Sequence, residues 1–195
     1  ITLAAGEQAA GNEFRANRVL AGGDLSLGAG GTIYSHEGVT FPTINSPISF
    51  AASFTKTGEG DLTLGGANTI PGGTVVSAGT LLVTNANALG AAGITTTVKT
   101  GASLEIRFGL DRPVTLEDGA SLGGHGGGYS HGKLTIDPAA GSVTLYGAGV
   151  PSPLGSFTIG NAANDLTGGN SSTIIQVSGS LDNRMAGWGS RYSKV

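Results

Sequence analysis

The chain has 195 residues, of which 36 are glycine and none is cysteine, and its formal net charge at pH 7 is −3. The lack of cysteine excludes disulfides, thiol chemistry and cysteine-bound zinc, and it is compatible with a secreted protein. The weak charge offers no basic surface for nucleic acid, and no apolar run approaches the ~20 residues of a membrane-spanning helix.

Residues 1–24 are expected to form an N-terminal cap or the first coil of a repeated structure. Within them, the segment EQAAGNEFRANRVL (residues 7–20) contains the chain's only hint of a helix. This region also carries two acidic residues, Glu7 and Glu13, which could meet a basic partner surface.

Residues 25–180 repeat one pattern, in which a short apolar pair is followed by a glycine-rich connection. The pairs are Leu25/Leu27, Val39/Phe41, Ile48/Phe50, Leu62/Leu64, Val75/Val76, Leu81/Val83, Thr96/Val98, Leu104/Ile106, Val114/Leu116, Leu134/Ile136, Val143/Leu145, Phe157/Ile159 and Ile175/Val177. Successive pairs start roughly ten residues apart, and no amphipathic helix separates them, which predicts an all-β fold.

Regular short strands suit a sandwich, a barrel or a β-solenoid, and three features favour the solenoid. Asp118-Gly119 is the only pair of the Asn-Gly or Asp-Gly type that closes tight hairpins. The strands are short, with two inward residues each. Small residues dominate, as a narrow stacked coil requires where its backbone turns. We therefore predict a parallel β-helix, or β-solenoid, of short strands and glycine-rich turns.

Alternation along the strands indicates which side chains point into the solenoid. In SLEIRFGL (residues 103–110), Leu104, Ile106 and Phe108 share one face, and Glu105 and Arg107 share the other. The predicted core consists of Leu62, Leu64, Leu81, Val83, Leu104, Ile106, Val114 and Leu116.

Three asparagines fall in predicted turns, namely Asn68, Asn85 and Asn87. They could form ordinary Asx turns, or they could stack between coils as amide ladders. The sequence leaves both arrangements open.

Residues 53–90 contain an ordered series of short motifs. They are Lys56-Thr57-Gly58-Glu59-Gly60, Leu62-Thr63-Leu64, Gly66-Ala67-Asn68-Thr69, Gly72-Gly73-Thr74, Ala78-Gly79-Thr80-Leu81 and Ala88-Leu89-Gly90. The segment resembles the autotransporter-associated β-strand repeat, also called the passenger-associated transport repeat, with a local departure at Ile70 and Pro71. The resemblance implies a right-handed parallel β-helix that is secreted and serves as the stalk of a surface protein.

The densest charge lies between residues 105 and 118, where Glu105 and Glu117 could be neighbours on adjacent coils. Two nearby carboxylates are the minimum for glycosidic acid–base chemistry. The alternative is a solvated outer face with cross-strand pairs between glutamate and arginine. No aromatic sugar platform or third acid accompanies the pair, so we expect no catalytic residues.

The two clustered histidines, His125 and His131, lie in a glycine-rich segment. A zinc site needs three or four ligands, and the nearest acid, Asp137, would be a poor third. We expect exposed loop histidines, with no metal and no cofactor.

Residues 181–195 abandon the repeated pattern and form a C-terminal tail, which could be a cap or a docking segment. The tail concentrates aromatic and basic residues typical of interfaces. With Glu7 and Glu13, the candidate assembly interface comprises Arg184, Trp188, Arg191, Tyr192 and Lys194. Because the end coils of a solenoid are templates for further coils, head-to-tail self-assembly into a filament is one expectation.

The function expected from these features is that of a non-catalytic, extracellular or cell-surface stalk or filament subunit. The alternative is a carbohydrate-active or glycan-binding β-helix adhesin, with surface glycans as partners. Nucleic acid is not an expected partner.

Overall fold

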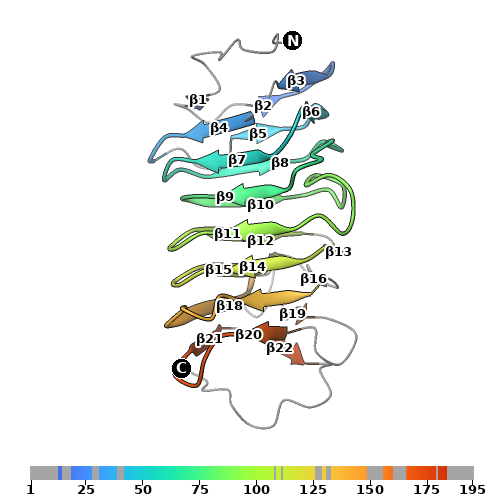
Figure 1. Cartoon of the computed structure of the whole chain (residues 1–195). Helices are drawn as coiled ribbons and strands as arrows, with labels where there is room; N and C mark the ends of the chain where they lie inside the picture. Colours follow the sequence, from blue (N-terminus) through green and yellow to red (C-terminus); the bar gives the residue numbers. More distant parts are fainter. Residues whose placement is uncertain are drawn as a thin grey trace.

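A computed structural model describes residues 13–14, 19–27, 31–38, 42–107, 109–110, 112–125, 129–130, 133–148, 156–159, 166–178 and 180–183. Every regular element in these ranges is a β-strand, and every strand pair is parallel, as the sequence predicted. Figure 1 shows the strands stacked from β1–β3 at one end of the molecule to β20–β22 at the other. None of the described segments forms a helix long and apolar enough to cross a membrane.

Two long sheets run along the molecule, and each has eight strands. The first sheet contains, in order, β1 (Glu13–Phe14), β4 (Gly31–Ser35), β7 (Phe54–Thr57), β9 (Thr74–Val76), β11 (Thr96–Val98), β14 (Val114–Leu116), β17 (Leu134–Ile136) and β20 (Leu166–Gly168). The second contains β2 (Val19–Leu20), β5 (Thr43–Ile44), β8 (Leu62–Leu64), β10 (Thr80–Val83), β12 (Ser103–Ile106), β15 (Ser121–His125), β18 (Ser142–Ala148) and β21 (Ile174–Ser178).

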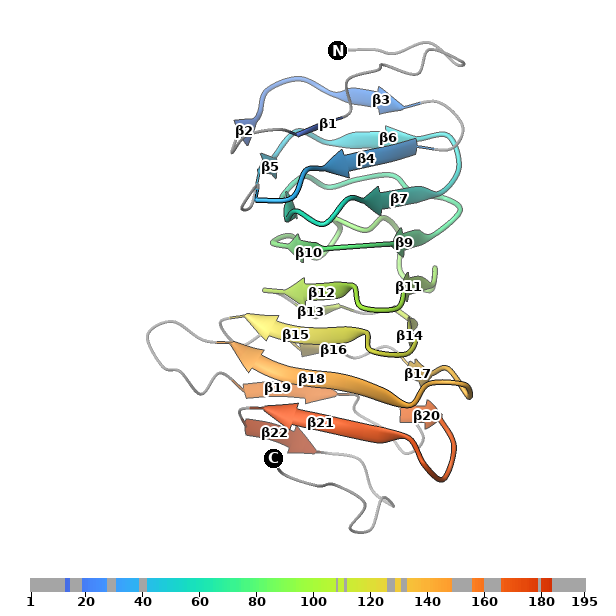
Figure 2. The ribbon, with the colours of Figure 1, turned by 90° about the vertical axis from the view of Figure 1, so that its left-hand side faces the viewer.

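A third set of strands is shorter and interrupted. Its four-stranded sheet contains β13 (Gly109–Leu110), β16 (Tyr129–Ser130), β19 (Ser156–Ile159) and β22 (Ser180–Asn183), and a separate pair joins β3 (Leu25–Leu27) to β6 (Ile48–Phe50). The chain visits the sheets in turn: β7 lies in the first sheet, β8 in the second, and β9 in the first again. One such circuit is a coil, and Figure 2 shows the coils lying one above another. The molecule is therefore a β-solenoid.

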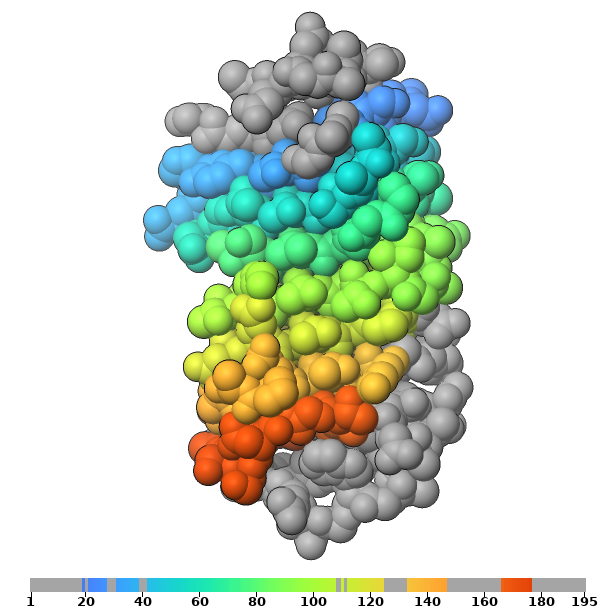
Figure 3. All heavy atoms as spheres, in the orientation of Figure 1, coloured from blue at the N-terminus to red at the C-terminus, as the bar shows by residue number. Residues whose placement is uncertain are grey.

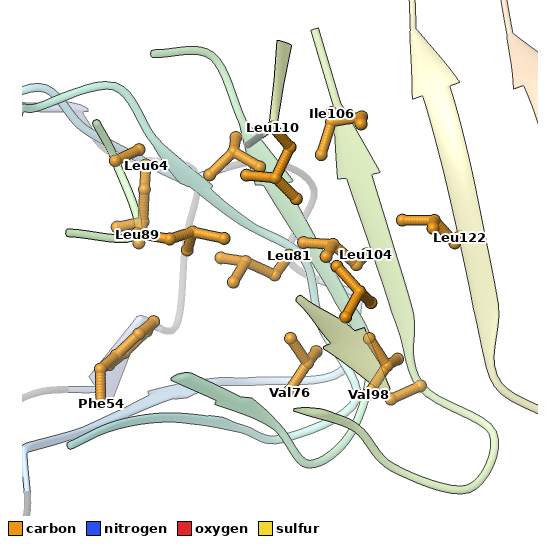
Figure 4. Packing of buried hydrophobic residues seen from close by; sticks show 14 of the residues in the cluster. Phe54, Leu64, Val76, Leu81, Leu89, Val98, Leu104, Ile106, Leu110 and Leu122 are labelled. Carbon is orange, nitrogen blue, oxygen red and sulfur yellow. The ribbon is translucent and has the colours of Figure 1, made fainter. Parts of the chain in front are cut away.

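Identical apolar residues stack in a row along the inner face of the second sheet. Leu62, Leu81, Leu104, Leu122 and Leu145 are partners in register on successive strands of the second sheet. The eight predicted core residues are all buried, each at most 3% exposed. Figure 4 shows side chains such as Leu81, Leu104, Val76 and Val98 meeting in the interior from different strands. The predicted core is therefore confirmed.

The structure differs from the predicted strands in several places. Parts of the segment with helical character form the strands β1 and β2, because they pair with β4 and β5. The pair Val75/Val76 does not point inward as a unit, since neighbouring strand residues face opposite sides, and Thr74 is buried instead of Val75. The other strands that were not predicted are β4, β5, β7, β13, β15, β16, β20 and β22. Val39, Phe41 and Phe108 lie outside the described residues.

The asparagines have different roles. Asn68 is buried, and its side chain connects coils: it accepts a hydrogen bond from the backbone N of Ile48 (2.8 Å) and donates one to the carbonyl of Ala88 (2.6 Å). Asn85 forms an Asx turn, since its Oδ1 accepts from the backbone N of Asn87 at 2.9 Å, and its Nδ2 donates to the Gly65 carbonyl of the preceding coil at 3.2 Å. The Asx turn is confirmed for Asn85, whereas Asn68 bonds to the backbone of both neighbouring coils.

Candidate functional site

The two carboxylates considered for catalysis do not form a pair. Glu105 lies in β12 of the second sheet, whereas Glu117 follows β14 of the first sheet. Glu117 pairs with Lys99 at 2.5 Å. The structure thus separates the two acids, and the ion pair on the outer face uses lysine where arginine was expected.

Glu105 belongs to a different cluster on the outer face of the second sheet. The Tyr146 hydroxyl donates to Glu105 Oε1 at 2.7 Å and lies 3.1 Å from Ser103 Oγ. The Tyr146 ring lies against Gly123, where an added Cβ would come within 2.4 Å of the ring atoms. Burial raises the pKa of the Tyr146 phenol, so this residue is a hydrogen-bond donor and a poor nucleophile.

Of the predicted histidine and assembly residues, only His125 and Glu13 lie in the described ranges. His125 ends β15, but its side chain is not described, and His131 lies outside the described residues. Glu13 lies in β1 opposite Tyr34 of β4. The other assembly candidates lie outside the described ranges: Glu7, Arg184, Trp188, Arg191, Tyr192 and Lys194. Across the described residues, no group of three or more His, Asp or Glu side chains could hold a metal ion.

The most unusual feature of the interior is a buried lysine. In β7 the alternation of Phe54, Thr55 and Lys56 places Lys56 on the same inward face as Phe54. Its partners in register are Ile33 and Val76, so a charged side chain interrupts an apolar row. Lys56 is 0% exposed. A lysine is almost never fully buried unless its ammonium has partners.

The Lys56 ammonium is held by backbone carbonyls. Its Nζ donates to the carbonyl oxygens of Gly58 (2.5 Å), Gly60 and Ala78 (2.8 Å). The first two belong to the turn that follows β7, and Ala78 belongs to the corresponding turn of the next coil. We call these three carbonyls the lysine cradle. One side chain thereby fixes two turns and joins two coils.

Glycine is required around the cradle because there is no room for a side chain. Gly58 has a φ of 77°, and an added Cβ would lie 2.1 Å from the Ser35 carbonyl oxygen. Gly79, with a φ of 61°, would place a Cβ 2.5 Å from the Gly60 carbonyl oxygen and 2.6 Å from Lys56 Nζ. The Lys-Thr-Gly-Glu-Gly and Ala-Gly motifs therefore have a steric explanation.

The electrostatics of Lys56 reflect its burial. Desolvation lowers the pKa of Lys56 to about 8, while the carboxylates of Asp61 and Glu59 act in the opposite direction. At neutral pH the side chain keeps its proton, and the ammonium has three donors for the three carbonyls.

Arg112 is a second buried cation, only 2% exposed. Its guanidinium donates to the carbonyl oxygens of Leu89 (2.5 Å), Gly90 (2.7 Å) and Ala91 (3.0 Å), all in the preceding coil. Burial lowers the pKa of Arg112. The interpretation of residues 105–118 as a wholly solvated charged face is therefore wrong for Arg112, because its planar donors match three successive carbonyls.

Sequence reasoning missed both buried cations as connectors. For Lys56 a signal was present, because the alternation F-T-K-T puts the lysine on the face of Phe54, just before a Gly-x-Gly turn. Arg112 offered no comparable signal. Its position between Asp111 and Pro113 resembles an ordinary polar turn.

Comparison with known proteins agrees with this arrangement. Residues 54–83 match the family model of the passenger-associated-transport-repeat. The chain is also 39% identical over 153 residues to the adhesin BmaC autotransporter of Brucella suis biovar 1 (strain 1330), a match that covers 77% of this chain and 4% of that protein. The chain thus spans a small part of that adhesin's length. No solved structure matches the chain significantly. The predicted family resemblance is confirmed.

Proposed function

Since the chain carries a passenger-associated-transport-repeat within a β-solenoid, we propose that it is a non-catalytic structural module of a secreted surface protein. The module acts as a stiff stalk at the cell surface or outside the cell. The observation that carries the proposal is the unbroken stacking of the two eight-stranded parallel sheets. Figure 3 presents the described coils as successive bands along the molecule, in the order of the sequence.

The solenoid is proposed to be right-handed. Crossover connections between parallel strands of one sheet are right-handed in about 98% of cases. The family resemblance points to the same hand.

A structural role is favoured over catalysis by the placement of the acids. Glu105 lies in the second sheet and Glu117 follows a strand of the first, and each contacts another side chain, Tyr146 and Lys99 respectively. An experiment tests the role directly: an antibody against the purified chain should label intact cells that express the parent protein, and negative-stain images of the chain should show short rods. Compact round particles, or labelling only after lysis, would contradict the proposal.

Head-to-tail assembly is a further part of the proposal. Parallel strands at the end of a solenoid can pair with another coil, and a heterologous contact of this kind produces filaments unless it closes. The basic aromatic tail around Trp188, Arg191 and Tyr192 and the acidic residues Glu7 and Glu13 have opposite charge. Fibres from the full chain and short particles after deletion of residues 184–195 are expected. An intact chain that sediments as a monomer at high concentration would rule assembly out.

A second candidate, glycan binding by an adhesin, is favoured by one aromatic pair. Tyr34 is 39% exposed, and its ring lies edge-on to His36, with a centroid distance of 6.0 Å and an interplanar angle of 77°. Exposed aromatic rings with a polar edge suit contacts with sugars. On a glycan array, the wild type should bind and Tyr34→Ala should not. Lack of binding by the wild type, or full binding by the variant, would remove this candidate.

A further inference from the structure

Four of the eight buried polar or charged side chains join the coils between residues 31 and 112 in series. Ser35 donates to the Asp61 carbonyl of the next coil at 2.5 Å. Asn68 bonds to the coils on both sides of its own. Lys56 reaches the following coil and Arg112 reaches the preceding one. These four coils, from β4 to β13, are the amino-terminal coils.

The coils between residues 114 and 178, from β14 to β21, are connected differently. They are the carboxyl-terminal coils. Asp118 accepts from the backbone N of Gly141 and Ser142 at 2.8 and 2.9 Å, and Asn170 donates to the Pro138 carbonyl at 2.8 Å. Asp118 and Asn170 are both exposed, while the half-buried Thr173 donates to the Ala140 carbonyl at 2.8 Å. Water can replace each of these bonds when the coils separate, so they oppose opening less than buried bonds do.

We infer that the amino-terminal coils open as one cooperative unit and that the carboxyl-terminal coils open before them. In a solenoid each coil contacts only its neighbours, so local stability depends on the nearest interfaces. A buried cation in a carbonyl cradle couples its two coils, because their separation breaks several charge-assisted bonds together, although the desolvation of the cation offsets part of that gain. The junction between the two units follows Arg112, and the inference holds whether or not the module is a stalk.

Fraying from the ends must be separated from this effect. In the order of the first sheet, β7 is third from the amino end and β14 is third from the carboxyl end. Fraying alone predicts equal protection of these two strands. The buried connections predict that β7 is better protected.

Hydrogen exchange on the full chain, read by mass spectrometry, provides the test. We expect the amides of β7 and β8 to exchange at least tenfold more slowly than those of β14 and β15. Equal rates, or faster exchange in β7 and β8, would overturn the inference.

A matched pair of substitutions identifies the cause. Arg112→Met should raise the exchange of β11 and β12 at least tenfold, to the level of β14, and leave β7 and β8 slow. Arg107→Met, which changes an exposed arginine five positions away, should leave the rates unchanged. Should Arg112→Met fail to fold, Arg112→Lys keeps the charge with fewer donors and should produce a smaller change in the same strands. A uniform increase along the whole chain in either Arg112 variant would overturn the inference.

Discussion

The amino-terminal and carboxyl-terminal coils share the same two sheets but enclose different interiors. The eight buried polar or charged side chains found in the described residues all lie between Ser35 and Arg112. Three of them have hydroxyls without a hydrogen-bond partner, namely Thr63, Thr74 and Thr96. In the described part of residues 114–178, the buried side chains are apolar. The turns from the first sheet to the second change along the chain. Lys56 bonds to the turns that follow β7 and β9, whereas the turns with Ala102, Ala120 and Ala140 contribute a buried alanine, the first of them still in the amino-terminal coils.

The comparison teaches that the stacking of coils and the bonding of buried side chains between coils are separate properties of a solenoid. Backbone ladders and leucine rows continue through both sets of coils, so they specify the shape. Lys56, Asn68 and Arg112 add specificity, because each would lose several kcal/mol, about 2–7 for an unpaired polar group, without its own acceptors. The transport repeat occupies the coils in which this second requirement operates.

The largest expected effect tests what the two sets of coils share. Ile106→Asp in the amino-terminal coils and Leu145→Asp in the carboxyl-terminal coils should each cost more than about 4 kcal/mol, because an unpaired carboxylate would be buried. Circular dichroism melts provide the measurement, with Arg107→Ala and Thr144→Ala as outward controls. A wild-type melt for either core variant would refute the common interior.

The sequence predicted the stacked apolar core better than the buried side chains that bond between coils. Alternating residues such as Leu104 and Ile106 show their inward face directly, since the strand period is two. The burial of Lys56 and Arg112 was not predicted, because charged residues are normally exposed and because the partners of these two are main-chain carbonyls. A sequence pattern of side chains does not show where those carbonyls meet. The two hydrogen bonds of Asn68 were not predicted for the same reason, since their main-chain partners lie 20 residues away on either side.

A second prediction concerns the space around the lysine cradle. Gly79→Ala should cost about 3 kcal/mol, since the new Cβ would adopt a left-handed conformation and approach both Gly60 O and Lys56 Nζ. Gly101→Ala is the matched control. Its φ is 72°, but nothing lies within 4 Å of the added Cβ, so about 1 kcal/mol is expected from strain alone. Urea denaturation measures both, and equal costs would mean that the cradle is loosely packed.

The third prediction uses pH to distinguish the coils that contain a buried cation. The folded pKa of Lys56, about 8, lies below its ordinary value of 10.5. Between these values the folded chain binds fewer protons than the unfolded chain, so the free energy of unfolding should rise with pH. Lys56→Met lacks this contribution and keeps the other titrating groups, including Asp61 and Glu59.

Urea denaturation of wild type and Lys56→Met between pH 7 and pH 11 provides the measurement, within the range where both fold. The stability of the wild type relative to the variant should increase through the window from about 8 to 10.5. A decrease would show that the three carbonyls favour the ammonium more than burial disfavours it.

The smallest expected effect lies where the two sets of coils meet. Tyr146 of β18 reaches across β15 to Glu105 of β12, and thus connects a carboxyl-terminal coil to an amino-terminal one. The bond is half-buried, so water can replace it, and a coupling of about 1 kcal/mol is expected. Tyr146→Phe, Glu105→Gln and the double variant form the cycle that isolates this coupling from the other interactions of Glu105. A coupling of about 3 kcal/mol or more would make the phenol–carboxylate bond as strong a connector as a buried cation. The junction after Arg112 would then no longer be the weak point of the solenoid, and the contrast between exposed and buried connections would fail there.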